Sequence, residues 1–178
     1  TAVIVGANGS GKSTFVNSMA GMSLTNLTVI PAQKNLYFSE KTYGRESYSI
    51  GQYQSVNLKS TNEDYKQDDQ MESQTTQRIF APFTYMITAL VNEVAQISTD
   101  ERGFNLSDRT VSTWDRLMKI WEKMIPEITF RVDSTARKII AKRNNQEYPL
   151  NRLSDGEKSI LFYIGNVLLT SKDAYIVV

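Results

Sequence analysis

A short apolar segment followed at once by a glycine-rich loop is the feature that most constrains what this chain can fold into. Residues 1–5 (TAVIV) are apolar and mostly β-branched, which predicts a buried strand. Residues 6–14 (GANGSGKST) match the pattern G-x-x-x-x-G-K-[ST] in full, and a helix is expected from about residue 12 to 20. This order of elements brings successive backbone N–H groups and a helix N-terminus to one point, which favours binding of a phosphate.

The residue types in this loop each have a chemical reason to be there. Glycine lets the backbone curl until its N–H groups face one phosphate. The Lys12 ammonium can bridge the β- and γ-phosphate oxygens of a nucleoside triphosphate, and the Ser13 hydroxyl can ligate its Mg²⁺. A chance match in a glycine-containing turn is the alternative, which the preceding strand and the following helix disfavour. The predicted nucleotide-binding residues are Asn8, Gly9, Ser10, Gly11, Lys12, Ser13 and Thr14.

The composition excludes several other kinds of site. The 178 residues include no cysteine and no histidine, so thiolate or histidine metal ligands and histidine-dependent nucleophiles are excluded within this chain. With 20 Lys+Arg against 19 Asp+Glu, the net charge of +1 predicts no strong electrostatic attraction to nucleic acid or to membranes. The longest apolar stretch, residues 160–169, is too short to cross a bilayer. We therefore expect no membrane association and a cytoplasmic location.

A second motif lies near the end of the chain. Residues 153–158 (LSDGEK) mark the start of a helix predicted over about residues 155–171, and the apolar residues 174–178 after it predict another buried strand. A serine hydroxyl and a bare glycine backbone at a helix N-terminus form a second candidate anion site. An ordinary helix cap by Ser154 or Asp155 is the alternative. The two roles do not exclude each other.

Taken with the phosphate loop, LSDGE resembles the signature motif of ABC-type ATPases, in the LSxGE form of SMC, RecF and OLD-like proteins. The resemblance implies ATP and Mg²⁺ as ligands. It also implies that Ser154 and the backbone at Gly156 contact the γ-phosphate of an ATP held by the phosphate loop of a second head. Lys12 and Ser154 cannot serve one nucleotide within one head, so we expect a homodimer with two ATP molecules between its heads. The implied signature residues are Ser154, Asp155, Gly156 and Glu157.

The same resemblance gives a role to Gln33, which follows a short strand predicted over residues 27–30. ABC-type ATPases place there a glutamine that reaches the Mg²⁺ and the attacking water. Lys12 and Gln33 are thus the implied catalytic residues, and Ser13 and Gln33 are the implied metal ligands; a plain surface loop is the alternative for Gln33. The Walker B aspartate, the catalytic glutamate and the switch histidine of such ATPases are expected beyond Val178.

The predicted fold is α/β: a P-loop NTPase of the ABC type, with a mixed sheet and a helical insert, incomplete at both ends. Residues 1–34 and 128–178 are expected to form the nucleotide-binding core, with residues 35–127 as the insert. Within the insert, residues 35–60 have a mixed pattern that allows short strands. Residues 61–78 are almost purely polar, which predicts a loop.

Periodicity and turn residues predict the remaining elements. Amphipathic helices are expected over about residues 80–97 and 111–125, the second one ended by Pro126. Strands are expected over residues 128–132 and 138–142, followed by a tight turn at Asn144-Asn145 that leads into Tyr148-Pro149-Leu150. On the helix predicted over residues 155–171, one face collects Ile160, Leu161, Ile164, Val167 and Leu168.

Two groups of side chains allow more than one interpretation. Trp114 and Trp121 lie seven residues apart on one predicted helix face, which favours core packing, with a partner-docking stripe as the alternative. A basic cluster surrounds a predicted strand, and it is either a solvated face or a set of contacts to nucleic acid phosphates. Its members are Arg137, Lys138, Lys142 and Arg143.

The LSDGEK form and the length of chain between Gln33 and Leu153 look like the OLD/RecF-like group of ATPases. That group includes Septu-type ATPases of bacterial anti-phage defence, which act with an HNH nuclease partner and also occur beside retrons. The resemblance implies an ATPase that regulates such a nuclease. The alternatives are a RecF/SMC-like head that binds DNA in repair and the ATPase subunit of a transporter.

Overall fold

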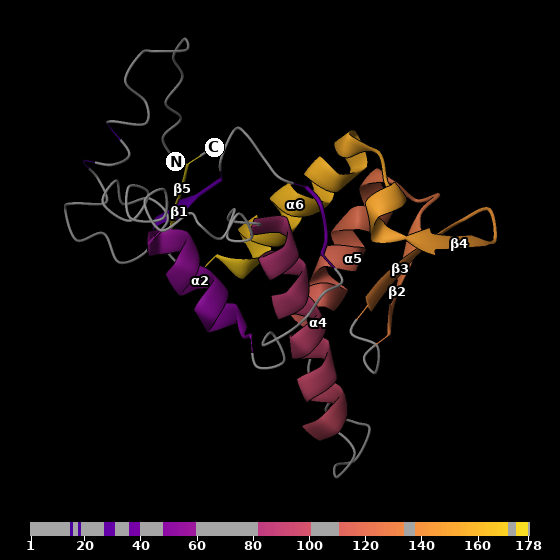
Figure 1. Cartoon of the computed structure of the whole chain (residues 1–178), viewed down its shortest axis with the longest axis horizontal. Helices are drawn as coiled ribbons and strands as arrows, with labels where there is room; N and C mark the ends of the chain where they lie inside the picture. The colour runs from indigo at the N-terminus through magenta and orange to yellow at the C-terminus, as the bar shows by residue number, and fades with distance from the viewer. Residues whose placement is uncertain are drawn as a thin grey trace, which may run out of the picture.

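The computed structural model describes residues 15, 18, 27–30, 36–39, 48–59, 82–100, 111–133, 138–170 and 174–177. Within them the chain is a mixed α/β structure with two small sheets and four principal helices between them (Figure 1). Its elements are β1 (Leu27–Val29), α2 (Ile50–Lys59), α4 (Pro82–Asp100), α5 (Thr113–Met124), β2 (Thr129–Asp133), β3 (Lys138–Arg143), β4 (Gln146–Pro149), the 3₁₀ helix η3 (Leu150–Arg152), α6 (Asp155–Leu169) and β5 (Tyr175–Val177).

The first sheet joins the two ends of the described chain. β1 and β5 pair in parallel, with Leu27 opposite Tyr175 and Val29 opposite Val177. Parallel neighbours cannot be joined by a hairpin and need a crossover connection. Here the elements from α2 to α6 form that crossover connection. The strands predicted over residues 27–30 and 174–178 are both confirmed, as β1 and β5.

The second sheet is antiparallel, in the order β2–β3–β4. The predicted tight turn at Asn144 and Asn145 is confirmed, with φ angles of 49° and 64°. Asparagine tolerates this left-handed region better than most residues, and a two-residue hairpin turn requires it. The turn sets Arg143 opposite Gln146 and therefore determines where the Arg143 side chain leaves the sheet.

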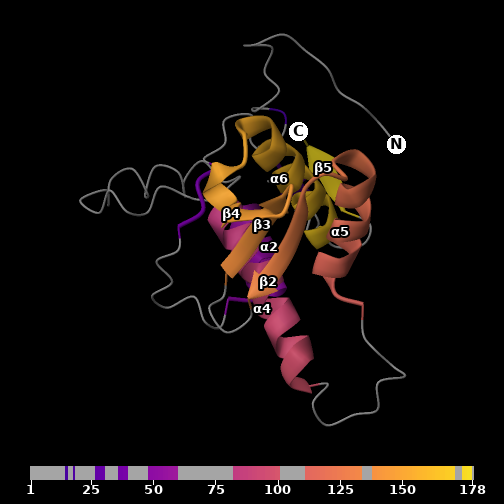
Figure 2. The ribbon, with the colours of Figure 1, turned by 90° about the vertical axis from the view of Figure 1, so that its right-hand side faces the viewer.

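The sheet packs one face against α5, as Figures 1 and 2 both show. The Phe130 ring lies edge-on to Trp114 and Trp121, with centroids 6.1 and 5.1 Å away. The two tryptophans are only 6% and 1% exposed, and Trp121 Nε1 donates to the Ile128 carbonyl at 2.9 Å. Core packing of the tryptophans is confirmed. The alternative of an exposed docking stripe is wrong, because the sheet covers that helix face.

The prediction of short strands within residues 35–60 is wrong over residues 50–59, which form α2. Ser49 and Gln52 begin this helix with reciprocal hydrogen bonds, from Gln52 N to Ser49 Oγ (3.2 Å) and from Ser49 N to Gln52 Oε1 (2.8 Å). This S-x-x-Q pattern is a capping box that the sequence already contained. Packing against the core stabilises this helix, since the Tyr53 side chain is buried there and is only 2% exposed.

The buried face of α6 is wider than predicted, and Val167 does not belong to it. Of the predicted residues, Leu161 is buried, and Ile160, Ile164 and Leu168 are half-buried against the core. The structure buries Leu161, Phe162, Gly165, Asn166 and Leu169, whereas Val167 is 50% exposed. Gly165 allows a close approach to α4, since a Cβ there would lie 2.9 Å from Met86 Cε. Asn166 is buried because its amide Nδ2 donates to the Phe162 carbonyl (2.8 Å) and its Oδ1 accepts from Tyr53 Oη (2.7 Å).

A phenylalanine substitution at Tyr53 tests this polar contact in the core. Tyr53→Phe leaves the buried Asn166 Oδ1 without its donor and should lower the free energy of unfolding by about 1–2 kcal/mol. The matched control is Tyr148→Phe, because the Tyr148 hydroxyl is also buried but has no hydrogen-bond partner among the described residues. Loss of the Tyr148 hydroxyl should leave the free energy of unfolding, measured with denaturant, unchanged or raise it. Equal destabilisation by both variants would contradict the role of the Tyr53–Asn166 bond.

Candidate functional site

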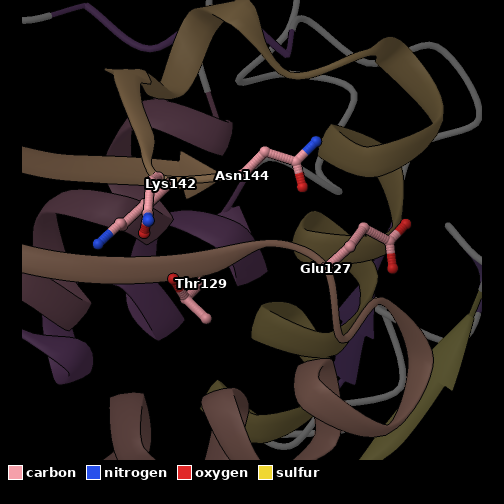
Figure 3. A pocket seen from close by; sticks show the side chains of 5 residues that line it. Glu127, Thr129, Lys142 and Asn144 are labelled. Atoms are coloured by element: carbon pink, nitrogen blue, oxygen red, sulfur yellow. The ribbon is translucent and has the colours of Figure 1, made fainter.

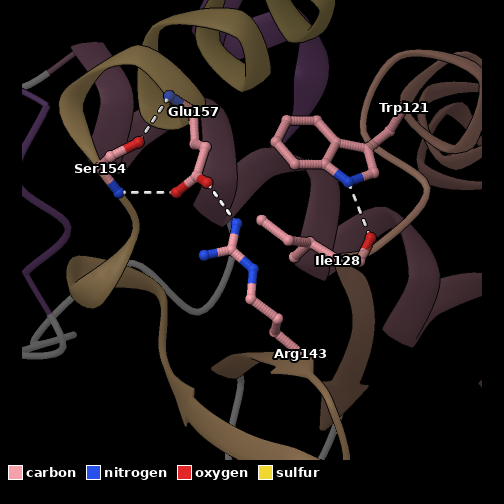
Figure 4. Close-up of polar contacts among 5 residues, drawn as sticks. All are labelled: Trp121, Ile128, Arg143, Ser154 and Glu157. Carbon is pink, nitrogen blue, oxygen red and sulfur yellow. Dashed lines mark hydrogen bonds and ion pairs between the residues drawn. The ribbon is translucent and has the colours of Figure 1, made fainter.

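Ser154 begins α6 as its N-cap, within a complete capping box (Figure 4). Ser154 Oγ accepts from Glu157 N at 3.3 Å, and Glu157 Oε2 accepts from Ser154 N at 2.8 Å. The ordinary helix cap is therefore present. The cap uses Ser154 Oγ only as an acceptor, so its hydroxyl hydrogen is not used by the cap and can be donated to an incoming anion.

Two buried leucines hold this end of the helix in place. Leu150 and Leu153 flank the 3₁₀ turn before Ser154 and are 1% and 3% exposed, and Leu153 N donates to the Leu150 carbonyl at 3.1 Å. The three residues that follow, Ser154, Asp155 and Gly156, are exposed. The sequence LSDG thus places an anchored leucine directly before an exposed helix N-terminus, whose unpaired N–H groups are partially positive.

Gly156 lies in the first turn of α6 with open space around it. Among the described residues, its chain neighbours and the backbone of its own helix aside, a Cβ added there would meet no heavy atom within 4 Å. Alanine is about 1 kcal/mol more favourable than glycine inside a helix, and less so in the first turn. Within the described residues nothing about packing requires glycine at this position. Gly156 therefore leaves the backbone of the helix N-terminus accessible to a ligand that approaches from outside this head.

Both acidic residues of the motif are paired with a cation. Asp155, whose side chain is 91% exposed, accepts from Lys158 Nζ at 2.9 Å, and Glu157 Oε1 accepts from Arg143 Nη2 at 2.5 Å (Figure 4). Burial raises the pKa of the Glu157 carboxyl, but the hydrogen bonds from Ser154 and Arg143 outweigh it and hold that pKa below its usual value. Glu157 is therefore ionised at neutral pH, with its charge neutralised inside the head.

The basic cluster is divided between the two faces of the antiparallel sheet. Arg143 lies on the inner face and binds Glu157, whereas Lys142, opposite Thr129, lies on the outer face. Arg137 lies outside the described residues. On the outer face Arg131 pairs with Glu147 at 3.4 Å, so basic and acidic side chains are mixed there. The cluster does not form one continuous basic surface within the described residues.

A shallow hollow of about 380 Å³ on the same sheet is lined by Glu127, Thr129, Lys142, Asn144 and Asn145. Figure 3 shows the labelled side chains pointing away from one another, with the Lys142 ammonium and the Glu127 carboxylate on different sides. A binding site needs polar groups that converge on a ligand. This hollow lacks that convergence.

The other predicted site residues lie outside the described residues. They are Asn8, Gly9, Ser10, Gly11, Lys12, Ser13, Thr14 and Gln33. In the helix predicted to follow the phosphate loop, the described residues Phe15 and Ser18 are helical, and Ser18 Oγ donates to the Phe15 carbonyl at 2.7 Å. Among the predicted site residues, the described chain brings together Ser154, Asp155, Gly156 and Glu157.

Arg143 contacts the LSDGE motif through Glu157, and sequence reasoning missed this position. The sequence contained the tight turn after it and the S-x-x-E capping box, but no sequence rule places the two within hydrogen-bond distance.

Within the described residues, no group of three or more His, Cys, Asp or Glu side chains could hold a metal ion. Nor is any described helix long and apolar enough to cross a membrane.

In a comparison with known protein families, the ABC transporter family model matches residues 1–177 of the chain. The search of curated proteins and the search of solved structures gave no match.

Proposed function

The chain belongs to the ABC transporter family, and on that premise we propose that it forms an ATPase head that closes on a second copy of itself around two ATP molecules. The family match makes it an ABC-type ATP-binding domain with a P-loop NTPase fold, and such domains generally hydrolyse ATP and typically dimerise around it. In the proposed dimer, the N-terminus of α6 in one head binds the γ-phosphate of the ATP held by the other.

The open helix N-terminus at Gly156 is the observation that supports this most directly. Apart from its chain neighbours, no side chain of the described residues lies within 4 Å of the position that a Cβ would take there, so a ligand can approach the backbone. The Ser154 hydroxyl beside it retains a hydrogen to donate, and the helix dipole favours an anion. A phosphate group presented by a second head satisfies all three features.

The remaining parts of the proposed site come from the sequence. The loop over residues 6–14 would hold the triphosphate, with Lys12 on the β- and γ-phosphates. Ser13 and Gln33 would hold the Mg²⁺ that neutralises the phosphates, and Gln33 would orient the attacking water. Since the γ-phosphate contacts both heads, ATP binding favours the closed dimer, and its hydrolysis removes the bridging group and opens the dimer.

Gly156→Ala tests this proposal in the full-length protein. The added methyl group should leave the stability of the monomer unchanged or raise it by up to about 1 kcal/mol, because it improves helix propensity and meets no neighbour. The same methyl group should obstruct the γ-phosphate and weaken ATP-driven dimerisation by at least about tenfold. Sedimentation velocity with and without ATP, together with thermal unfolding, measures the two effects.

Gly51→Ala in α2 is the matched control for this experiment. Gly51 is also an exposed helical glycine with space for a Cβ, whose nearest neighbour would be Ser49 Oγ at 3.9 Å. This variant should dimerise with ATP like the wild type. Normal ATP-driven dimerisation of Gly156→Ala would count against the proposed contact with the γ-phosphate.

We also propose that this head is cytoplasmic. From the LSDGEK form and the length of chain between Gln33 and Leu153, we propose that it regulates an HNH-type nuclease in anti-phage defence. A nuclease chain that copurifies with the full-length protein and responds to ATP would support this role. ATP-dependent affinity for duplex DNA without a nuclease, falling steeply with salt, would favour the repair-type head instead. Stable association with a membrane permease would favour the transporter subunit.

A further inference from the structure

The ion pair between Arg143 and Glu157 joins the antiparallel sheet to the N-terminus of α6. We propose that Arg143 is a positioning residue for γ-phosphate binding, which holds the Ser154 end of α6 in its binding geometry and neutralises the carboxylate beside it. This inference rests on the proposed function. Arg143 would not touch the nucleotide, because its guanidinium acts through Glu157.

The geometry connects Arg143 to Ser154 in two steps. Arg143 Nη2 donates to Glu157 Oε1 at 2.5 Å, and the other carboxylate oxygen, Oε2, accepts from Ser154 N at 2.8 Å (Figure 4). Each oxygen thus holds a different element. The Glu157 side chain is only 17% exposed, so the carboxylate is fixed between sheet and helix. Without Arg143 it could turn toward solvent and release the Ser154 backbone.

The charges of the motif give Arg143 a second effect. Asp155 and Glu157 both lie in the first turn of α6, where ATP would bring a strongly negative phosphate group. Carboxylates near a phosphate repel it, and repulsion between like charges across an interface is costly. Lys158 balances Asp155, and Arg143 balances Glu157. Removal of Arg143 would leave one uncompensated negative charge at each γ-phosphate site of the dimer.

The position of Arg143 in turn depends on the hairpin. Arg143 is the last residue of β3, directly before the turn at Asn144 and Asn145. β3 is the central strand of the antiparallel sheet, so a shift of that sheet relative to α6 would change the distance between the guanidinium and Glu157. The hairpin and the γ-phosphate site are therefore expected to respond to each other through this pair.

Arg143→Gln in the full-length protein tests the inference, with Arg131→Gln as the matched control. Arg131 and Glu147 form a similar pair on the outer face of the same sheet, with side chains 55% and 51% exposed. If the binding constant falls about threefold at each γ-phosphate site, the dimerisation constant falls about tenfold, because the dimer holds two such sites. Arg143→Gln should therefore weaken ATP-driven dimerisation about tenfold and leave the ATP affinity of the monomer unchanged. Arg131→Gln should change neither quantity, and Arg143→Lys should recover part of the loss.

A double variant and the lysine variant distinguish the proposed role from a loss of folding. In a Glu157→Gln background, Arg143→Gln should have a much smaller effect, because the charge that Arg143 neutralises is gone. If Arg143→Gln fails to fold, the comparison moves to Arg143→Lys, which should dimerise about two- to threefold less tightly than the wild type.

Three results would overturn the inference: wild-type dimerisation by Arg143→Gln, an equal loss in Arg131→Gln, or wild-type dimerisation by Arg143→Lys where the glutamine variant does not fold. A failure of the proposed function looks different, because the wild-type protein itself would then fail to dimerise with ATP.

Discussion

Replacement of Lys12 by alanine is expected to abolish ATP binding at concentrations that saturate the wild-type protein. Lys12 occupies the lysine position of the pattern in residues 6–14, where its ammonium would contact the β- and γ-phosphates directly. Loss of a charged hydrogen bond to a phosphate, together with the uncompensated phosphate charge, predicts a decrease in affinity of about 100-fold or more. Isothermal titration of the full-length protein with ATP and Mg²⁺ measures this loss.

Lys119→Ala serves as the control for charge alone. Lys119 is exposed on α5, far in sequence from both motifs, so this variant removes the same charge without touching the proposed site. It should bind ATP like the wild type. Unchanged ATP affinity in Lys12→Ala would mean that residues 6–14 do not hold the nucleotide, and the proposed function would then lose its basis.

The second large effect is expected from Ser154→Asp, which separates the helix cap from the γ-phosphate contact. Aspartate is as good an N-cap as serine, so α6 and the stability of the monomer should be retained. At the proposed interface, however, the new carboxylate would face a phosphate and could not donate a hydrogen bond. Repulsion of this kind costs several kcal/mol, so ATP-driven dimerisation should fall by at least about 100-fold while the monomer still binds ATP.

Ser49→Asp is the matched control, because it makes the same change at another N-cap. Ser49 caps α2, which contacts the opposite end of α6 through the bond between Tyr53 and Asn166. This variant should dimerise with ATP normally. Sedimentation velocity at a series of protein concentrations gives the dimer dissociation constant for each variant. Normal dimerisation of Ser154→Asp would remove Ser154 from the interface and leave it a helix cap only.

Local patterns predicted much of the described fold. Apolar residues at helical spacing predicted α4 and α5, and the Asn144-Asn145 pair predicted the hairpin. The LSDGEK segment, with Ser154 or Asp155 as a candidate cap, predicted the start of α6. These features succeed because their causes act within a few residues of chain: side-chain periodicity, backbone φ preference and capping hydrogen bonds.

The errors occurred where distant contacts outweigh the local pattern. Asn166 lies on the buried face of α6 because Tyr53, 113 residues earlier, donates to its amide oxygen. Gly165 joins that face because it admits the Met86 side chain from α4. Hydrophobicity alone places neither residue in the core, so a face chosen from the apolar residues omitted both of them and included the exposed Val167.

The sequence by itself determined the LSDGE helix start and the strands over residues 27–29 and 175–177, and it predicts the phosphate loop of residues 6–14. Each follows from short-range chemistry. Only the tertiary structure decided that Arg143 binds Glu157, that β1 pairs with β5 and that Gly156 is open to solvent. These features depend on how the crossover helices pack. Local sequence does not fix the distance between residues that are far apart along the chain, and packing does.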